Sequence, residues 1–183
     1  FDAYRTLIGY VPQDDIIHRT LPVERALSYA AQLRLPNDTA PSEIKQRIER
    51  VLEDVEMTMH RDKLVENLSG GQRKRVSIGA ELLADPSLFF LDEPTSGLDP
   101  ISAAQFDDLI AYLQQELHLT VVMITHDLDT IFRICQRVGV IVDRKLVQDT
   151  RERIVDYPHP WIQAYFHGTR AARFSQQGAP HGA

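Results

Sequence analysis

Two neighbouring carboxylates, Asp92 and Glu93, follow directly after the apolar run at residues 88–91. A strand that ends this way places its acids at the carboxyl edge of a parallel sheet, where ligands bind in open α/β folds. Asp92 suits Mg²⁺ held through water, because that ion keeps most of its hydration shell, and Glu93 is placed to polarise an attacking water molecule. An isolated Asp-Glu pair would indicate only two charges at a strand end. The complete run LFFLDEPTSGLD favours the metal and water site.

Polar side chains also follow two other strand-like runs. Gln13 ends the run TLIGYVPQ, where its amide can bind Mg²⁺ or contact the water molecule, although an ordinary loop amide would look the same. His126 follows the run LTVVMIT, where an imidazole can donate to a γ-phosphate oxygen and orient the water. Each signal is weak alone, but His126 gains weight because it comes one strand after the carboxylates.

The stretch ENLSGGQRKRVSIGAELL at residues 66–83 is typical of a phosphate-binding turn that opens a helix. Ser69 is predicted to cap the helix, and Gly70 and Gly71 allow the backbone to approach a ligand closely. The first N–H groups of the helix and the positive end of its dipole favour an anion. This turn therefore suits a phosphate of high negative charge.

Periodicity predicts the elements that must position these residues. Continuous apolar runs predict strands buried on both faces, whereas amphipathic runs predict helices, with Asp99 as a helix cap and Pro100 at the first helical position. Their alternation from about residue 75 onward predicts a parallel α/β sheet, preceded by an all-helical block at 21–66. The pattern fades after about residue 150. Strands are expected at 6–13, 86–92, 119–125, 138–143 and 145–149, and helices at 21–35, 42–57, from 69, at 99–117 and at 127–138.

Length and composition limit the classes of protein. The 183 residues suffice for one ordinary domain, and the net charge of −6 argues against free nucleic acid as a partner. One cysteine, Cys135, excludes a disulfide framework, fits a reducing compartment and is expected to be buried on a helix face. No apolar run approaches the ~20 residues that span a bilayer, and no signal peptide opens the chain. Because the chain starts at Phe1 and enters a strand almost at once, we expect a fragment of a longer protein.

Taken in order, these motifs resemble those of the nucleotide-binding subunit of ABC transporters. Gln13 matches the Q-loop, residues 68–72 the signature, 89–92 the Walker B strand, 96–99 the D-loop and His126 the H-loop. Five motifs in this order make a highly specific match. The resemblance implies an α/β fold of the P-loop NTPase (RecA-like) type, with a parallel sheet core and an inserted all-helical subdomain. It also implies ATP and Mg²⁺ as ligands, and ATP hydrolysis coupled to transport.

The resemblance covers residues 6–150 and implies a role for each site residue. Glu93 is the implied general base or water-orienting residue, Gln13 and His126 complete the catalytic group, and Asp92 and Gln13 attend Mg²⁺. In the family, two such subunits face each other head to tail, and the signature of one closes on the γ-phosphate bound by the other. The residues that would contact nucleotide in this way are Ser69, Gly70, Gly71, Gln72 and Asp99.

One element of the family pattern is missing. The Walker A loop, G-x-x-x-x-G-K-[ST], should precede the Q-loop, but no Gly in this sequence is followed by Lys. We therefore expect that the N-terminal third of the domain is missing. What remains is a partial ATPase domain at 1–150, with a helical and signature subdomain at about 14–75 and a RecA-like core at about 76–150, and a tail at 151–183.

The missing loop leaves two hypotheses open. A Walker A motif encoded upstream of Phe1 would indicate a working energy-coupling ATPase. An upstream stop codon without that motif would indicate a catalytically incompetent piece that offers only a trans-acting signature surface. A soluble ABC ATPase of repair or translation is a third alternative, and the lack of basic patches typical of nucleic-acid binding argues against it.

The two halves of the chain resemble different subtypes. The part before about residue 99 looks like the G-type ATPases that pair with ABC-2 permeases, and the part after about residue 101 looks like the Mla-type lipid-trafficking ATPases. The back half favours a lipid or hydrophobic substrate. In the tail, Trp161 and Tyr165 are expected either to pack onto the domain or to dock on a membrane surface or partner.

The family resemblance also implies the partners. These are a second nucleotide-binding subunit, which completes a dimer, and a transmembrane permease that the helical block contacts. No nucleic acid is expected among them. The protein would then be cytoplasmic and peripheral, on the cytoplasmic face of the inner or plasma membrane.

Overall fold

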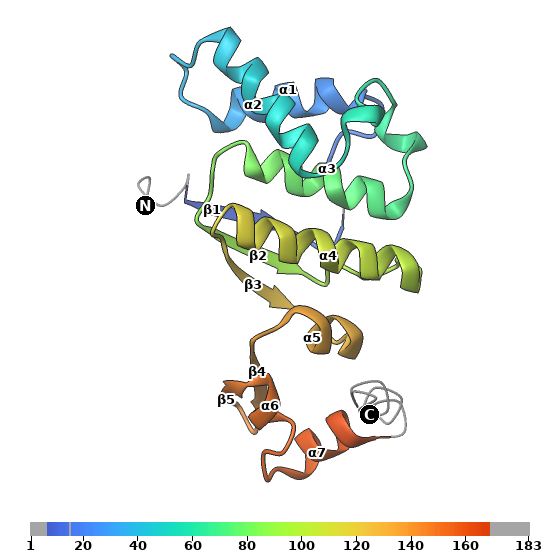
Figure 1. Cartoon of the computed structure of the whole chain (residues 1–183), viewed down its shortest axis with the longest axis vertical. Coiled ribbons are helices and arrows are strands. Elements are labelled where there is room, and N and C mark those ends of the chain that lie inside the picture. Colours follow the sequence, from blue (N-terminus) through green and yellow to red (C-terminus); the bar gives the residue numbers. More distant parts are fainter. Residues whose placement is uncertain (1–6, 15, 169–183) are drawn as a thin grey trace, which may run out of the picture. The chain divides into compact units, whose positions relative to one another are not determined.

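The computed structural model describes residues 7–14 and 16–168 of the chain (Figure 1). The chain divides into two compact units, one up to Thr125 and the other from His126 onward. The strands of the first unit are β1 (Ile8–Val11), β2 (Leu88–Asp92) and β3 (Thr120–Ile124), and its helices are α1 (Val23–Arg34), α2 (Pro41–Asp54), η2 (Thr58–His60), η3 (Val65–Asn67), α3 (Gly70–Leu82) and α4 (Pro100–Glu116).

The sheet of the first unit is parallel and has the strand order β1-β2-β3. Its register places Gly9 opposite Phe89 and Leu91 opposite Met123. Gly9 is needed where β1 meets β2, because a Cβ there would lie 2.6 Å from the Phe89 ring. The carboxyl ends of the strands therefore meet at one edge, and the predicted α/β class with a parallel sheet is confirmed.

The helices α1 and α2 form the predicted helical block and share an apolar core with α3. Leu27 of α1 and Leu52 of α2 are fully buried. At the crossing of α3 and α2, a Cβ on Gly79 would lie 2.9 Å from Cγ1 of Val51, so only a glycine permits this approach. The close crossing holds α3 between the helical block and β1, which both contact it.

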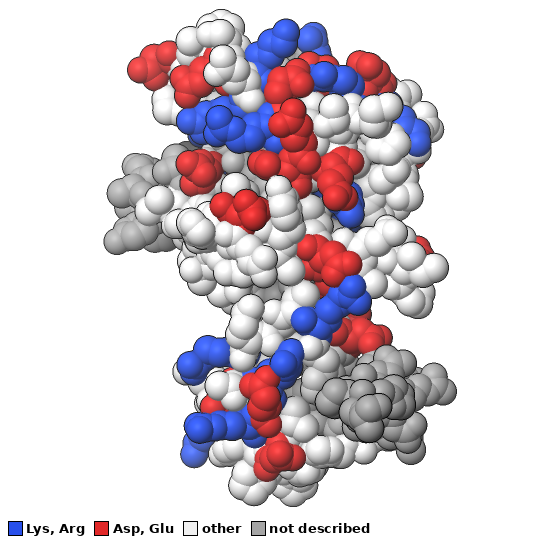
Figure 2. Space-filling view, in the orientation of Figure 1, with Lys and Arg blue, Asp and Glu red and all other residues white. Residues whose placement is uncertain are grey.

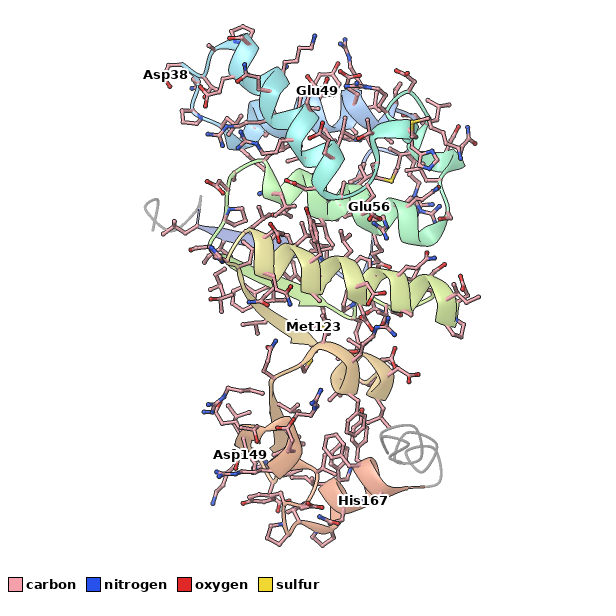
Figure 3. All side chains as sticks on the ribbon, viewed as in Figure 1. Asp38, Glu49, Glu56, Met123, Asp149 and His167 are labelled. Carbon is pink, nitrogen blue, oxygen red and sulfur yellow. The ribbon has the colours of Figure 1, made fainter. Side chains whose placement is uncertain are left out.

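The outer surface of this block is charged. Lys and Arg side chains are interspersed with Asp and Glu side chains over it (Figure 2). Arg61 pairs with Glu24 of α1 at 3.2 Å and with Glu49 of α2 at 2.5 Å (Glu49 is labelled in Figure 3). The hydrogen bond from Arg61 lowers the pKa of Glu49. The charged face therefore also joins α1 and α2 through the segment that follows α2.

Helix α4 begins where the sequence predicts. Oδ1 of the N-cap residue Asp99 accepts hydrogen bonds from the N–H groups of Ile101 and Ser102, both at 3.0 Å, and Pro100 occupies the first helical position. The helix buries an apolar stripe and contacts α3. The stripe consists of Phe106, Leu109, Ile110 and Leu113.

The expectation of strands buried on both faces is wrong for β3. Val122 is 42% exposed and Ile124 is 64% exposed. The exposed side chains alternate along β3, so one face of this strand is uncovered within the described residues. In β2, the central strand, Phe89 and Leu91 are buried while their neighbours are half-buried. A continuous apolar run does not show by itself how many layers cover a strand.

In the second unit, the two closing strands do not continue the parallel sheet. They pair with each other in an antiparallel hairpin through the turn residues Asp143 and Arg144, which both have positive φ. A two-residue turn can only join antiparallel strands, so the parallel sheet predicted from residue 75 onward does not extend into this unit. The elements are α5 (Leu128–Ile134), β4 (Arg137–Val142), β5 (Lys145–Thr150), α6 (Arg151–Ile154) and α7 (Pro160–His167).

The helix expected at 127–138 ends early, at Ile134, because the chain enters β4 three residues later. Cys135 therefore lies at the C-cap and is only half-buried, not buried on a helix face as expected. Beyond residue 150, where the sequence pattern fades, α6 and α7 complete the core of the unit. That core consists of Ile131, Ile154, Ile162 and Phe166.

Candidate functional site

The turn before α3 is closed by reciprocal hydrogen bonds between Ser69 and Gln72. Oγ of Ser69 accepts from the N–H of Gln72 at 3.2 Å, and Oε1 of Gln72 accepts from the N–H of Ser69 at 3.1 Å. This is a capping box, which fixes the first helical turn. The side-chain nitrogen Nε2 of Gln72 also lies 3.0 Å from Nε2 of His60. The predicted cap residue is confirmed, and Ser69 itself is exposed.

Gly70 and Gly71 bring the first turn of α3 against the start of α4. A Cβ on Gly70 would lie 3.1 Å from a methyl group of Leu98, and one on Gly71 would lie 3.7 Å from Cβ of Ser102. The first N–H groups of a helix lack partners within the helix, so this turn offers donors to an anion. The two predicted nucleotide contacts, the signature turn and the cap at Asp99, are thus brought side by side.

The carboxylates lie at the end of β2. Oδ2 of Asp92 is 3.5 Å from the hydroxyl of Tyr10. Glu93 has a φ of 43° and donates its N–H to the carbonyl of Ile124 at 2.8 Å. A left-handed backbone at a residue other than Gly costs about 1–3 kcal/mol and is concentrated at functional sites. The chain therefore turns directly after Asp92.

Gln13 lies at the neighbouring strand end, as predicted, and contacts the loop that follows β2. Its side-chain nitrogen donates to Oγ of Ser96 at 3.3 Å. Its backbone carbonyl accepts from the ammonium group of Lys74 on α3. Gln13 therefore joins three segments that carry predicted motifs. A carboxylate and an amide at adjacent strand ends are oxygen ligands that suit hydrated Mg²⁺.

His126 is the first residue of the second unit. Its backbone carbonyl accepts a hydrogen bond from the hydroxyl of Tyr165 on α7 at 2.8 Å. Tyr165 stacks on Trp161 with ring centroids 5.1 Å apart, and Trp161 remains 52% exposed. Of the two readings of the tail, packing therefore describes Tyr165, while the function of the exposed Trp161 face stays open. The γ-phosphate role of His126 stays a prediction.

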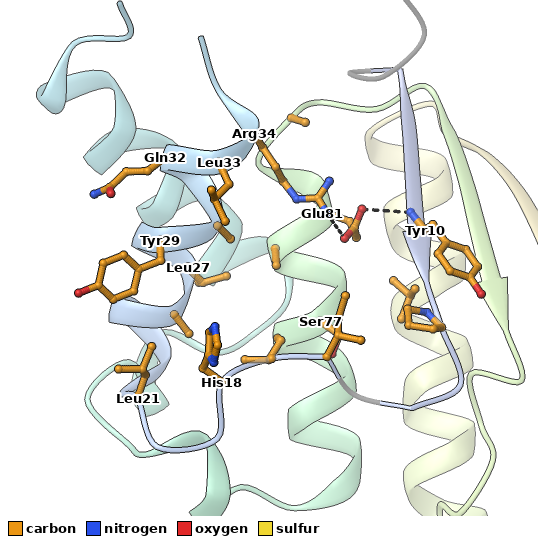
Figure 4. Close-up of a pocket in the computed structure, with 18 of the residues that line it drawn as sticks. Tyr10, His18, Leu21, Leu27, Tyr29, Gln32, Leu33, Arg34, Ser77 and Glu81 are labelled. Atoms are coloured by element: carbon orange, nitrogen blue, oxygen red, sulfur yellow. Dashed lines mark hydrogen bonds and ion pairs between the residues drawn. The ribbon is translucent and has the colours of Figure 1, made fainter. Parts of the chain in front are cut away.

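A cavity of about 900 Å³ opens beside the strand that leads to Gln13 (Figure 4). Apolar side chains of α1 and of the segment before it line most of its wall, including Ile17, Leu27 and Leu33. Polar residues also line it, among them Arg34 and Glu81, which form an ion pair. The cavity is large enough for several side chains of a partner.

Sequence reasoning missed the residues that hold the motifs together. Lys74 and Tyr10 contact predicted site residues, and His60 contacts Gln72. Only Lys74 gave a signal, as a charged residue inside the stretch that opens α3. Tyr10 lies three residues before Gln13, but its partner Asp92 is 82 residues away in sequence.

No helix in the described part of the chain is both long and apolar enough to cross a membrane. Within those residues, no group of three or more His, Cys, Asp or Glu side chains forms a metal site. A hydrated Mg²⁺ ion needs only one or two protein ligands when phosphate oxygens supply others.

Curated proteins of several kinds are similar to this chain. An ABC transporter ATP-binding/permease protein of Mycobacterium tuberculosis is 48% identical over 138 residues, which are 75% of this chain and 16% of that protein. The ABC transporter G family member 8 of Dictyostelium discoideum is 37% identical over 156 residues, 80% of this chain and 25% of that protein. The methionine import ATP-binding protein MetN of Haemophilus ducreyi is 36% identical over 154 residues, 81% of this chain and 44% of that protein. The chain thus spans less than half the length of each.

A solved structure of cbiO1 from Clostridium perfringens, part of the ABC transporter complex cbiONQ, has a TM-score of 0.74 to this chain. It is 29% identical, and the match covers 94% of this chain and 68% of that one. The likeness confirms the α/β fold class of ABC ATPases that the resemblance implied. The family model described as ABC transporter matches residues 1–96, just over half of the 183 residues. The chain therefore belongs to the ABC transporter family, as an ATP-binding domain.

Proposed function

We propose that the chain is part of an ATP-hydrolysing, energy-coupling subunit of an ABC transporter. The observation that carries this proposal is the position of Gln13. Its side chain contacts the loop after the carboxylate strand, and its carbonyl contacts the helix that the signature opens. Gln13 thereby links the loop after the carboxylates to the helix that the signature opens, within one compact unit.

The signature would act on a nucleotide held by a second nucleotide-binding subunit. Oγ of Ser69 already accepts the N–H of Gln72, so its own proton is available for a phosphate oxygen. The N–H groups of Gly70 and Gly71 add donors at the positive end of the helix dipole. Together with the family resemblance, these donors support a head-to-tail dimer in which Asp99 lies beside the signature.

The strand-end residues would act on MgATP. Asp92 and Gln13 would hold hydrated Mg²⁺, whose charge offsets the negative charge of the phosphates. Glu93 would accept a proton from the attacking water or orient it, and His126 would donate to a γ-phosphate oxygen. The left-handed backbone at Glu93 supports a role different from that of Asp92, because such conformations are concentrated at functional sites.

A transmembrane permease would dock on the cavity next to α1. Its apolar wall and single ion pair suit a short helix with an apolar face. The subunit would then lie on the cytoplasmic face of the membrane through this partner. A lipid or hydrophobic substrate is supported by the resemblance of the back half of the chain to lipid-trafficking ATPases. The match to a G-family relative also extends into this half, because it covers 80% of the chain.

Two alternatives remain for this chain. A second candidate, supported by the exposed signature turn at Ser69, is a polypeptide that offers only this surface to a complete partner. A soluble ABC ATPase without a permease would leave the cavity without a use. Reading the coding sequence upstream of Phe1 for a Walker A motif separates the first alternative from the proposal.

The decisive experiment replaces Glu93 by Gln in the whole polypeptide that the gene encodes. We expect phosphate release from MgATP to fall about a hundredfold or more, because proton transfer from water is lost. The affinity for ATP should stay within about threefold, since the change is confined to the reacting group. Glu116→Gln on the exposed end of α4 is the matched control and should leave turnover unchanged. Undiminished turnover in Glu93→Gln would contradict the role assigned to Glu93.

A further inference from the structure

One face of α3 buries polar side chains where an apolar stripe would be expected. Lys74, Ser77 and Glu81 are only 4%, 6% and 5% exposed. They are spaced three and four residues apart, so they share one side of the helix. Burying an ammonium or a carboxylate is costly unless it is paired and hydrogen-bonded. The hydrogen-bond and ion-pair partners of these side chains therefore explain how their burial is tolerated.

Lys74 and Glu81 find backbone partners on β1 and at its carboxyl end, whereas the hydroxyl of Ser77 donates to the carbonyl of Arg73 within α3 at 3.2 Å. The carboxylate of Glu81 accepts the N–H of Tyr10 at 3.0 Å and pairs with Arg34 (Figure 4). The ammonium group of Lys74 donates to the carbonyls of Pro12, at 3.3 Å, and Gln13. Since β1 is an edge strand of the described sheet, one side of its backbone has no strand partner there. Side chains of α3 take that place.

This arrangement fixes Gln13 from two directions. Its carbonyl is held by the buried end of Lys74, and its side chain reaches Ser96 beyond the carboxylate strand. Rotation or withdrawal of α3 would move the carbonyl and, with it, the side chain. Ser77 and Glu81, on the same face of α3, also line the cavity. A partner that shifts α3 from the cavity would therefore also shift Gln13.

We propose that Lys74 is a positioning residue for Gln13, and that the Lys74–Glu81 face of α3 transmits occupation of the cavity to the carboxylate edge of the sheet. The second part rests on the function proposed above, whereas the first part does not. Lys74 acts through Gln13 and does not itself touch nucleotide.

The first test uses the chain alone, labelled for NMR. Lys74→Met removes the donors while keeping an unbranched side chain, and Lys45→Met on the exposed face of α2 is the control. We expect the side-chain amide signal of Gln13 to move in Lys74→Met, because the side chain follows the backbone that Lys74 holds. The capping-box amides of Ser69 and Gln72 should keep their wild-type signals, as should all of these groups in Lys45→Met. An unchanged Gln13 in folded Lys74→Met would overturn the proposal.

If Lys74→Met fails to fold, the unmodified chain decides the first part. A scalar coupling across the hydrogen bond, between Nζ of Lys74 and the carbonyl carbon of Gln13, is the expected result. Rapid exchange of the ammonium protons with solvent, without such a coupling, would mean that the group is not held at Gln13.

The second test measures ATP turnover of the encoded polypeptide with and without its permease. We expect Lys74→Met to lower kcat about tenfold, with KM within about twofold, because a misplaced Gln13 affects the reacting geometry more than binding. Stimulation by the permease should fall as well. If the wild type has no turnover, the proposed function fails, while the NMR result still decides the role of Lys74. Normal permease stimulation in Lys74→Met would overturn the transmission through α3.

Discussion

The helices α3 and α4 begin alike and pack differently. Each starts at a side-chain cap, Ser69 for α3 and Asp99 for α4, and the two first turns touch through Gly70 and Gly71. Helix α4 buries an apolar stripe whose largest member is Phe106, with one buried charged residue, Asp107. Helix α3 buries apolar residues against the helical block, but it presents polar ones to β1.

The difference shows what each helix has to do. An apolar stripe gains stability from removal of surface from water, roughly in proportion to area and with little directional demand. A buried polar face is favourable only when each group meets its partner, so it fixes the relative position of helix and strand. Helix α4 supports the sheet, and α3 connects its edge strand to the signature.

The largest predicted effect is on the α4 side of the comparison. Phe106→Ala should lower the free energy of unfolding by about 3–5 kcal/mol, because a fully buried ring would leave a cavity. Urea denaturation followed by circular dichroism measures this loss. Tyr112→Ala, at a ring that is 49% exposed on the same helix, is the control and should cost far less. Equal losses for the two variants would contradict the assignment of the stripe.

The cap of α3 has the next largest effect. Ser69→Ala should lower the free energy of unfolding by about 1 kcal/mol, because Gln72 loses its acceptor and the turn loosens. Urea denaturation measures the change, and Ser42→Ala on α2 is the control, because that helix has no side-chain cap to lose. A loss in Ser42→Ala as large as that in Ser69→Ala would mean that the capping box adds nothing specific.

Low pH should remove the stability that the Asp99 cap gives to α4. Hydrogen bonds from the hydroxyl and N–H of Ser102 hold the pKa of Asp99 below its ordinary value. A lowered pKa contributes stability that is present above the ordinary value and is lost as the pH falls through the lowered one. Stability profiles of the wild type and Asp99→Asn should therefore converge in acid. Parallel profiles over the range from about pH 2 to about pH 6 would contradict this cause.

The buried carboxylate of Glu81 on α3 should give stability the opposite dependence on pH. Burial raises the pKa of Glu81, against the opposing effects of the Tyr10 N–H and Arg34. A raised pKa contributes stability that is present below the ordinary Glu value and is lost as the pH rises through the raised one. Relative to Glu81→Gln, the wild type should therefore lose stability as the pH rises from the acid range towards neutral. A wild type that gains stability there relative to Glu81→Gln would show that the ion pair outweighs burial.

Local signals in the sequence predicted the starts of α3 and α4 and the placement of Gln13 and Asp92 at adjacent strand ends. These features depend on side chains close in sequence or on the rule that parallel strands share one carboxyl edge. The exposure of β3 and the hairpin of β4 with β5 were not predicted. Apolar runs of this length look the same in a central strand, an edge strand and a hairpin.

The sequence by itself determined the family, the order of the motifs and the residue types that would bind phosphate and Mg²⁺, because these are written in short contiguous stretches. Only the tertiary structure decided that Lys74 and Glu81 are buried and which backbone groups they meet. Their partners are separated from them by 61 to 71 residues. A charged residue on a helix is usually solvated, and only the arrival of an edge strand beside it provides the hydrogen bonds that make its burial favourable.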